Sequence, residues 1–165
     1  ALYRSHYPRI YRFLYRLTQS GDEAEDLAQE TFVKLYRCRE NSTLPENPTA
    51  WLFKVAANAC YSHLRQTRRR RELVEDERSH QHFPPGPTSR HNVEDEFMEK
   101  EKRLRVQRAM QKLPLKDRMI LELFRTGLPY GDIARILELK ASSVSKKLFR
   151  ARKKLVFELK TGDAL

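Results

Sequence analysis

The stretch YGDIARILELKASSVSKKLFRARKKL, residues 130–155, decides the fold class of this chain. Ile133, Ile136 and Leu137 have the spacing of one apolar helix face. The next three residues, 138–140, form a connection of the length found between the helices of a helix-turn-helix. The second helix then repeats apolar residues at helical spacing, at Val144, Leu148, Ala151 and Leu155. We therefore predict a helix-turn-helix unit here.

The second helix of this unit carries cations on the side opposite to its apolar stripe. Residues 140–154 contain seven basic residues and no acidic one, whereas a solvated helix surface normally mixes both signs. We interpret this helix as a recognition helix that enters the major groove of DNA. The side chains expected near base edges or flanking phosphates are Ser143, Lys146, Lys147 and Arg150, and those expected to touch only phosphates are Lys153 and Lys154.

The composition of the rest of the chain agrees with a helical, polyanion-binding protein. Among 165 residues, 33 are Lys or Arg and 22 are Asp or Glu, which gives a formal charge of +11. That excess favours nucleic acid or an anionic membrane surface as partner, and its sign does not choose between them. Only 5 glycines occur and few segments alternate as strands do, so we predict an all-α protein.

The order of helical and irregular segments predicts two small helical domains. Helical patterns cover most of residues 1–72 and return over residues 96–165, where Gly127 is expected to end one helix. Residues 73–95 contain Pro84-Pro85-Gly86-Pro87 and no helical apolar pattern. We expect them to form a flexible linker between the two domains.

The N-terminal domain is expected to open with two helices that pack together. The first has an apolar face and a row of tyrosines four residues apart, for which we favour helix–helix packing over base stacking; the face is Leu2, His6, Ile10, Phe13, Leu14 and Leu17, and the row is Tyr3, Tyr7, Tyr11 and Tyr15. The second helix begins with a capping box, either Ser20 with Glu23 or Asp22 with Glu25. Its inward residues are expected to be Ala24, Leu27, Ala28, Thr31 and Leu35.

Five carboxylates crowd the first half of that second helix, at Asp22, Glu23, Glu25, Asp26 and Glu30. Such charges stabilise a helix N-terminus, and solvated charge is the simplest explanation for them. A carboxylate cluster would repel DNA, however, so in a DNA-binding protein we interpret it as a surface for a protein partner.

A third helix is expected to start near Thr49 and to end in a run of arginines over residues 65–71. Its predicted apolar face is Trp51, Leu52, Val55, Ala56 and Ala59. Beside that face, amide, aromatic and cationic side chains share one row, formed by Lys54, Asn58, Tyr61, Arg65 and Arg68. Such a row suits a nucleic-acid backbone and an unstacked base, although an ordinary polar helix surface would also carry these residue types.

Several classes of site receive no support from the sequence. Cys38 and Cys60 form no CxxC pair, so we expect two free thiols in a reducing cytosol. His80, His82 and His91 are expected to be solvated linker residues because no defined further ligands accompany them. We predict no metal, no cofactor and no enzyme motif, no membrane insertion, and a cytoplasmic location.

The acidic helix, the polar row and the helix-turn-helix together resemble the extracytoplasmic-function sigma factors of the primary-sigma family. Residues 22–36, DEAEDLAQETFVKLY, look like region 2.2 of that family, which docks on the clamp helices of the RNA polymerase β′ subunit. The resemblance implies polymerase-binding roles for Asp26, Gln29, Glu30, Val33 and Tyr36, with Phe32 nearby.

The same resemblance assigns promoter contacts to both domains. Residues 51–58 with the following arginine run look like regions 2.3 and 2.4, which read and melt the −10 element. The implied −10 residues are Lys54, Asn58, Tyr61, Ser62, Arg65, Arg68 and Arg69, aided by the loop 41–49. Residues 113–155 look like region 4, the −35 reader, and the implied −35 residues are Ser142, Ser143, Lys146, Lys147, Arg150 and Lys153.

Two positions depart from the family pattern. Ser62 stands where the family often has an acidic residue, and Glu138 stands where the helix-turn-helix turn often has glycine. With Ser62, the −10 sequence that the family typically prefers does not carry over to this chain. With Glu138, we expect a less regular turn.

The resemblance implies four partners: the β′ clamp helices and β subunit of core RNA polymerase, promoter DNA and an anti-sigma factor. The linker would run toward the polymerase active-site channel. The alternative function is a stand-alone helix-turn-helix regulator, which would bind duplex DNA tightly by itself and would have no affinity for polymerase.

Overall fold

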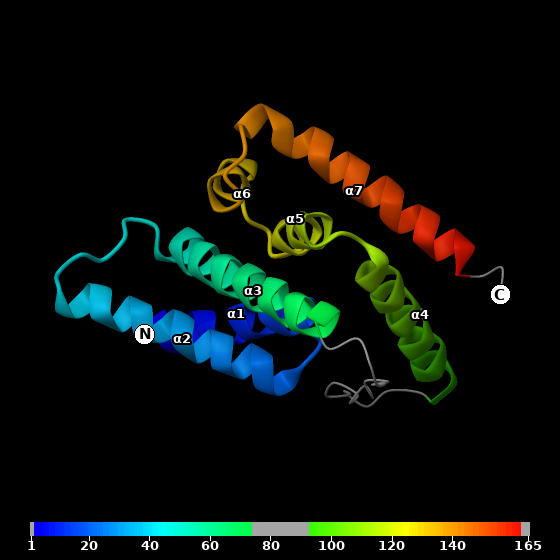
Figure 1. The fold of residues 1–165 in the computed structure, drawn as a ribbon, viewed down its shortest axis with the longest axis horizontal. Coiled ribbons are helices and arrows are strands. Elements are labelled where there is room, and N and C mark those ends of the chain that lie inside the picture. The colour runs from blue at the N-terminus through cyan, green and yellow to red at the C-terminus, as the bar shows by residue number, and fades with distance from the viewer. Residues whose placement is uncertain (1, 74–92, 163–165) are drawn as a thin grey trace.

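A computed structural model describes the backbone of residues 2–73 and 93–162, and in these ranges it contains seven helices and no strand (Figure 1). The all-α prediction is confirmed. Most of the predicted linker, with His80, His82 and His91, lies outside the described residues. The helices are α1 (Leu2–Thr18), α2 (Gly21–Glu40), α3 (Pro48–Leu73), α4 (Val93–Lys112), α5 (Leu115–Arg125), α6 (Tyr130–Ile136) and α7 (Ala141–Thr161).

Helices α1, α2 and α3 pack on one another and form the N-terminal half. Of the two capping boxes that the sequence allowed, the structure forms half of the one at Ser20. The Ser20 hydroxyl accepts a hydrogen bond from the Glu23 N–H at 3.3 Å, whereas the Ser20 N–H donates to the Thr18 hydroxyl at 3.3 Å and not to Glu23. The inward face predicted for α2 is buried as expected, and Phe32 is buried with it.

The tyrosine row of α1 packs within the protein. Tyr7, Tyr11 and Tyr15 are half-buried and stack along the helix with ring centroids 6.1–6.3 Å apart. Tyr3 and Tyr7 also contact the ring of Phe32 on α2, at 4.9 and 5.7 Å. The predicted role in helix packing is confirmed for this row, because its rings fill the contact between α1 and α2.

The apolar face predicted for α3 was partly wrong. Trp51, Val55 and Ala59 are only half-buried, whereas the fully enclosed residues of the helix are Leu52, Phe53, Ala56, Ala57 and Cys60. The cause is that α3 packs on α1 and α2 along one side and on α5 and α6 along another. A helix covered on two sides buries an arc that a single-face pattern does not describe.

Helices α4 to α7 form the C-terminal half, in which α7 packs on α4, α5 and α6. Val144, Leu148 and Ala151 are buried as the stripe predicted, and Leu155 is half-buried. Gly127, just beyond the end of α5, has a φ of 81°, which explains why glycine is favoured there.

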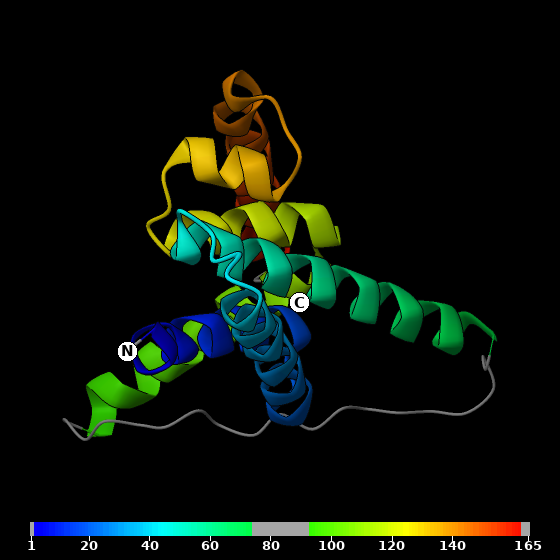
Figure 2. The ribbon, with the colours of Figure 1, turned by 90° about the vertical axis from the view of Figure 1, so that its left-hand side faces the viewer.

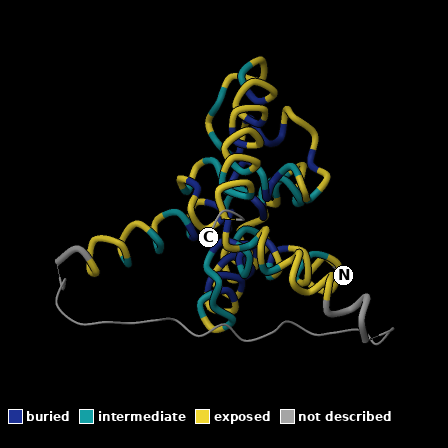
Figure 3. Tube along the Cα trace, turned by 90° about the vertical axis from the view of Figure 1, so that its right-hand side faces the viewer, coloured by how far each residue is buried: buried dark blue, intermediate teal, exposed yellow. Residues whose placement is uncertain are grey.

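The two halves are in contact with each other, which the sequence did not predict. Helix α1 packs on α5, and α3 packs on α6 and α5, so that the C-terminal half sits across one side of the N-terminal half (Figure 2). Buried residues of both halves belong to a single apolar cluster. In the burial view, buried residues line the inward sides of the helices, and exposed residues cover their outward sides (Figure 3).

We predict that Phe53→Ala lowers the free energy of unfolding by about 3–5 kcal/mol, because the ring is fully buried and packs edge-on against Phe13 at 5.4 Å. Val55→Ala, at a half-buried position of the same helix, should cost clearly less. Urea unfolding of both variants checks this expectation. Equal losses would mean that the buried arc of α3 is centred on Val55 instead.

Candidate nucleic-acid and protein interfaces

The predicted protein-binding residues of α2 lie together on its solvent side and form what we call the acidic face: Asp26, Gln29, Glu30, Val33 and Tyr36. All five are exposed, and Val33 and Tyr36 are 49% and 59% exposed although they are apolar. The Glu30 carboxylate pairs with Lys34 at 2.7 Å, and Asp26 is exposed one helical turn earlier. Exposed apolar side chains bordered by carboxylates suit a protein partner with a basic surface.

Phe32 does not belong to this face, contrary to its placement near the polymerase-binding residues. The ring is 8% exposed and is held by Tyr3 and Tyr7 of α1. Its position is therefore structural.

The polar row of α3 and the two further residues implied in −10 contact, Ser62 and Arg69, are all at least partly accessible. Lys54 and Tyr61 are half-buried, whereas Asn58, Ser62 and Arg65 are exposed. Asn58 and Tyr61 open into a cavity of about 460 Å³ that the C-terminal half completes. The arginines lie beyond this cavity, toward the end of α3, where their charge can meet a phosphate backbone.

The loop before α3 is anchored at Asn47. Its side-chain oxygen accepts a hydrogen bond from the Ala50 N–H at 3.0 Å, which caps the start of α3. Its amide nitrogen donates to the Asp132 carboxylate on α6 at 3.4 Å. The loop predicted to help read the −10 element is thus tied to the C-terminal half.

Helices α6 and α7 form the predicted helix-turn-helix. Glu138 in the turn has a φ of 54°, the left-handed conformation that glycine adopts without strain. This geometry explains why a glycine is common at that position. The turn is nevertheless closed by a hydrogen bond from the Leu139 N–H to the Ala134 carbonyl at 2.8 Å.

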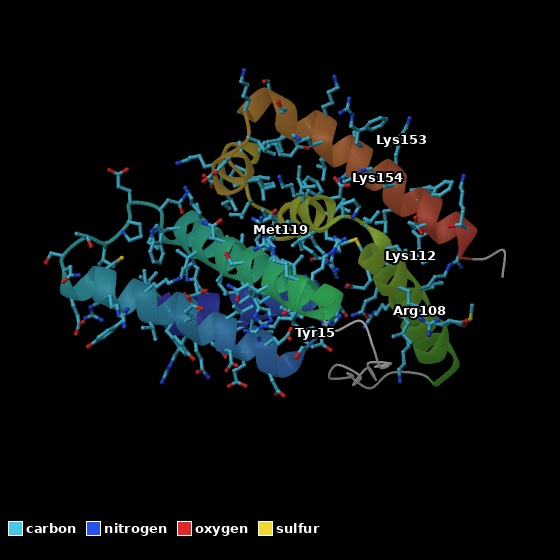
Figure 4. The ribbon with its side chains drawn as sticks, in the orientation of Figure 1. Tyr15, Arg108, Lys112, Met119, Lys153 and Lys154 are labelled. Carbon is cyan, nitrogen blue, oxygen red and sulfur yellow. The ribbon has the colours of Figure 1, made fainter. Side chains whose placement is uncertain are left out.

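Five of the α7 residues that were predicted to meet DNA are exposed, and Ser143 is half-buried; the exposed ones are Ser142, Lys146, Lys147, Arg150 and Lys153. Of these, Lys147 and Arg150 line the same cavity as Asn58 of α3. Lys153 and Lys154 lie on different sides of α7 (Figure 4).

Two basic residues of α7 are held by the protein itself. The Lys154 ammonium pairs with Asp117 of α5 at 2.5 Å, and the Arg152 guanidinium lies 4.5 Å from the ring centre of Phe124. The predicted phosphate contact of Lys154 would require that its ion pair with Asp117 be given up. The sequence contains no signal for either contact.

Sequence reasoning also missed Glu122, a carboxylate of α5 that is only 5% exposed at the contact between the halves. It faces Arg16 of α1 at 3.6 Å, just beyond hydrogen-bond distance. Burial raises the pKa of the Glu122 carboxyl, and the guanidinium groups of Arg16 and Arg125 oppose this only in part. The available signal was its place between Ile120 and Leu123, in the apolar stripe of α5.

Further hydrogen bonds join the halves. Arg9 donates to the Thr126 carbonyl at 3.1 Å, Arg118 donates to the Leu17 carbonyl at 3.5 Å, and Gln107 of α4 contacts Gln19 after α1. Together with Asn47, which bonds Asp132, polar groups of the N-terminal half thus contact α4, α5 with its C-cap residue, and α6.

Sites of other kinds are not found in the described ranges. No three His, Cys, Asp or Glu side chains among these residues are grouped to hold a metal ion, and none of their helices has the length and apolar character needed to cross a membrane. Cys38 and Cys60 are free thiols, and burial raises the pKa of the Cys60 thiol to about 12.

Comparison with protein families matches both halves of the chain. The model of sigma-70 region 2 matches residues 2–70, and the model of sigma-70 region 4 matches residues 103–155. The two matches cover the helices that carry the acidic face and the polar row, and then those that carry the helix-turn-helix.

The chain is also similar to several RNA polymerase sigma factors. The chain is 30% identical to the ECF RNA polymerase sigma factor SigE of Mycolicibacterium smegmatis, over 93% of the chain and 58% of that protein. It is 29% identical to the RNA polymerase sigma-H factor of Pseudomonas aeruginosa and 30% identical to the ECF RNA polymerase sigma-E factor of Escherichia coli. Each of these two alignments covers 87% of the chain and 77% of the relative.

Among solved structures, the sigma factor RpoE from Bartonella quintana, crystallised in complex with the anti-sigma factor NepR, has a similar fold. The TM-score is 0.73, and the match covers 96% of this chain and 94% of that one at 23% sequence identity. The likeness extends across both halves.

We predict that Glu122 makes the stability of the protein depend on pH. Because its pKa is raised, the folded chain holds the proton more tightly than the unfolded chain does. The contribution of Glu122 to the free energy of unfolding is therefore highest below the ordinary glutamate pKa of about 4.3. It falls as pH rises through the raised pKa that Glu122 has in the folded chain. Glu122→Gln should remove this fall, as measured by urea unfolding at pH 4 and pH 7. Glu101→Gln, at an exposed position, is the control and should keep it.

Proposed function

The chain belongs to the extracytoplasmic-function sigma factors of the sigma-70 family, and on that premise we propose that it binds core RNA polymerase and directs it to a particular set of promoters. The observation that carries this proposal is the pairing, in one chain, of an exposed acidic face in the region 2 match with a cationic recognition helix in the region 4 match.

We propose that the acidic face of α2 binds the clamp helices of the polymerase β′ subunit. Exposed apolar groups at Val33 and Tyr36 would supply the buried centre of such a contact, and Asp26 with Glu30 would supply its charged rim. Charges of this kind speed association and select a basic partner more than they add affinity. The face lies on α2, which packs on α1 and α3 and is free on its outer side.

The polar row of α3 would meet the −10 element. Asn58 can hydrogen-bond a base edge and Tyr61 can stack on an unpaired base, while Lys54 and the arginines Arg65, Arg68 and Arg69 hold phosphates. Ser62, a neutral side chain at a position where the family often has an acid, would contact the same strand. The loop 41–49 would support the unpaired base.

Helix α7 would enter the major groove of the −35 element. Lys146, Lys147 and Arg150 would reach base edges or phosphates, and Lys153 would touch a phosphate. Ser142 and Ser143, in the first turn of the helix, would contribute polar contacts beside them. The β subunit would hold this half on the polymerase.

The family membership and the Bartonella quintana structure support an anti-sigma partner, since that relative was crystallised with one. We also propose that the protein works in the cytoplasm as an initiation factor and performs no catalysis itself. A stand-alone regulator would leave the region 2 match unexplained.

We predict that the double variant Asp26→Lys, Glu30→Lys fails to co-elute with bacterial core RNA polymerase, because both carboxylates of the acidic face become cations. The matched control is Glu99→Lys, Glu101→Lys, which makes the same charge change on exposed residues of α4 and should co-elute like the wild type. Circular dichroism checks that each variant is folded. Co-elution of the first variant at wild-type level would contradict the docking assignment.

We predict that Lys146→Ala and Arg150→Ala each weaken binding to the −35 element by about 1–3 kcal/mol if the residue pairs with a base. Lys160→Ala, near the end of α7, should have little effect. Transcription assays with polymerase on promoters that differ at single −35 positions measure the change. A loss that is equal on all sequences would assign the residue to phosphate contact alone.

A further inference from the structure

We propose that the cavity bordered by α3, α5, α6 and α7 is a binding site for a small amphipathic anion, a medium-chain carboxylate with an alkyl chain and one negative head. The cavity has a volume of about 460 Å³. Two of its lining residues, Met119 of α5 and Lys154 of α7, are labelled in Figure 4. Binding at this site does not depend on the proposed function, whereas its effect on transcription does.

One part of the cavity wall is aliphatic. The side chains that form it are buried or half-buried: Met119 and Ile120 of α5, Ile136 of α6, and Leu137 and Leu139 in the turn after it. Flat ligands such as nucleobases are held by stacking on aromatic side chains, which this wall offers only at Tyr61 among the described residues. An alkyl chain therefore suits the wall better than a flat ring.

The other part of the wall carries cations that the protein does not neutralise. Lys116 of α5 and Lys147 and Arg150 of α7 are exposed and border the cavity. Among the residues that the structure describes, none of the three has an ion-pair partner. Three such cations at the rim of one cavity would attract an anion from solution.

Two carboxylates border the cavity as well, but they do not cancel this charge. Asp117 is already paired with Lys154 at 2.5 Å, and Glu138 is exposed in the turn before α7. With four cations and two carboxylates, the lining has an excess of two positive charges. Because the planar arginine group can donate two parallel hydrogen bonds to a carboxylate, we assign the head of the ligand to Arg150, together with Lys147 one helical turn earlier.

The size of the cavity favours a small molecule over a partner helix. Small-molecule sites in proteins have volumes of about 300–1,000 Å³. A single turn of a helix, about 10 Å wide and 5.4 Å long, already occupies about 400 Å³. The cavity would thus hold one turn at most, whereas a helix that binds in a groove uses anchors spread over two turns or more.

Calorimetric titration of the full chain with sodium decanoate, kept below its micelle-forming concentration, tests the site. We expect one decanoate to bind per chain. The double variant Lys147→Gln, Arg150→Gln should bind it about tenfold more weakly, because the head loses its charge-assisted hydrogen bonds.

The matched control is Arg103→Gln, Lys160→Gln, which makes the same charge change on exposed residues outside the cavity and should bind decanoate like the wild type. Circular dichroism checks that both double variants are folded. Equal affinities of the two variants for decanoate would refute the assignment of the head group to α7.

Other ligands test the head and the chain separately. Decylammonium has the same alkyl chain with a positive head, so it should bind at least tenfold more weakly than decanoate. From hexanoate to decanoate, the affinity should rise by up to about fourfold for each added methylene, the value for a fully buried CH₂ group. Equal binding of the two decyl ions, or an affinity that does not change with chain length, would overturn the proposal.

The effect on transcription rests on the proposed function, under which Lys147 and Arg150 contact promoter DNA. A bound carboxylate occupies the same two cations, so decanoate should lower promoter-specific transcription in a reaction with core polymerase. Leu137→Trp fills the aliphatic part of the cavity, and transcription by this variant should be insensitive to decanoate. The measure is the ratio of transcript made with and without decanoate. Equal ratios for this variant and the wild type would contradict competition at this site.

Failure of the site and failure of the proposed function give different results. A chain that binds decanoate as expected and does not co-elute with core polymerase would refute the proposed function and leave the site standing. A chain that supports transcription and binds no decanoate would refute the site alone. If Leu137→Trp does not fold, the calorimetric comparison of the two double variants decides.

Discussion

The burial of α3 on two sides is the constraint on which the rest of the structure depends. This helix supplies Phe53 and Leu52 to the core of the N-terminal half, and it also provides the surface on which α5 and α6 rest. The same helix carries the polar row. A residue on α3 therefore belongs to the core, to the contact between halves or to the proposed nucleic-acid surface, and residues next to each other in the sequence can belong to different ones.

The sequence predicted the local features well because each has a local cause. The apolar stripe of α7, the Ser20 cap of α2 and the glycine after α5 follow from helical spacing and backbone geometry. The exposed positions of the acidic face followed from the same spacing. The roles of these exposed residues came from a resemblance to a family, which periodicity alone does not supply.

Long-range contacts were not predictable in this way. The contact between the halves joins residues such as Arg16 and Glu122, which are more than a hundred positions apart and follow no repeat. It also moved the buried arc of α3 away from Val55 and toward Phe53. Two small helical halves can pack together in several ways, and the charge pattern of either half by itself does not choose among them.

The position of two α7 cations at the rim of the cavity has a consequence for the thermodynamics of DNA binding. Each phosphate that a cation neutralises releases condensed counterions, so the logarithm of the affinity falls with the logarithm of salt concentration by about 0.9 per contact. Lys146 and Lys153 are exposed outside the cavity, whereas Lys147 and Arg150 are exposed and line it. The steepness of that salt dependence thus counts the α7 cations that contact phosphates, and an equilibrium measurement on the DNA would tell whether the two cavity-lining cations are among them.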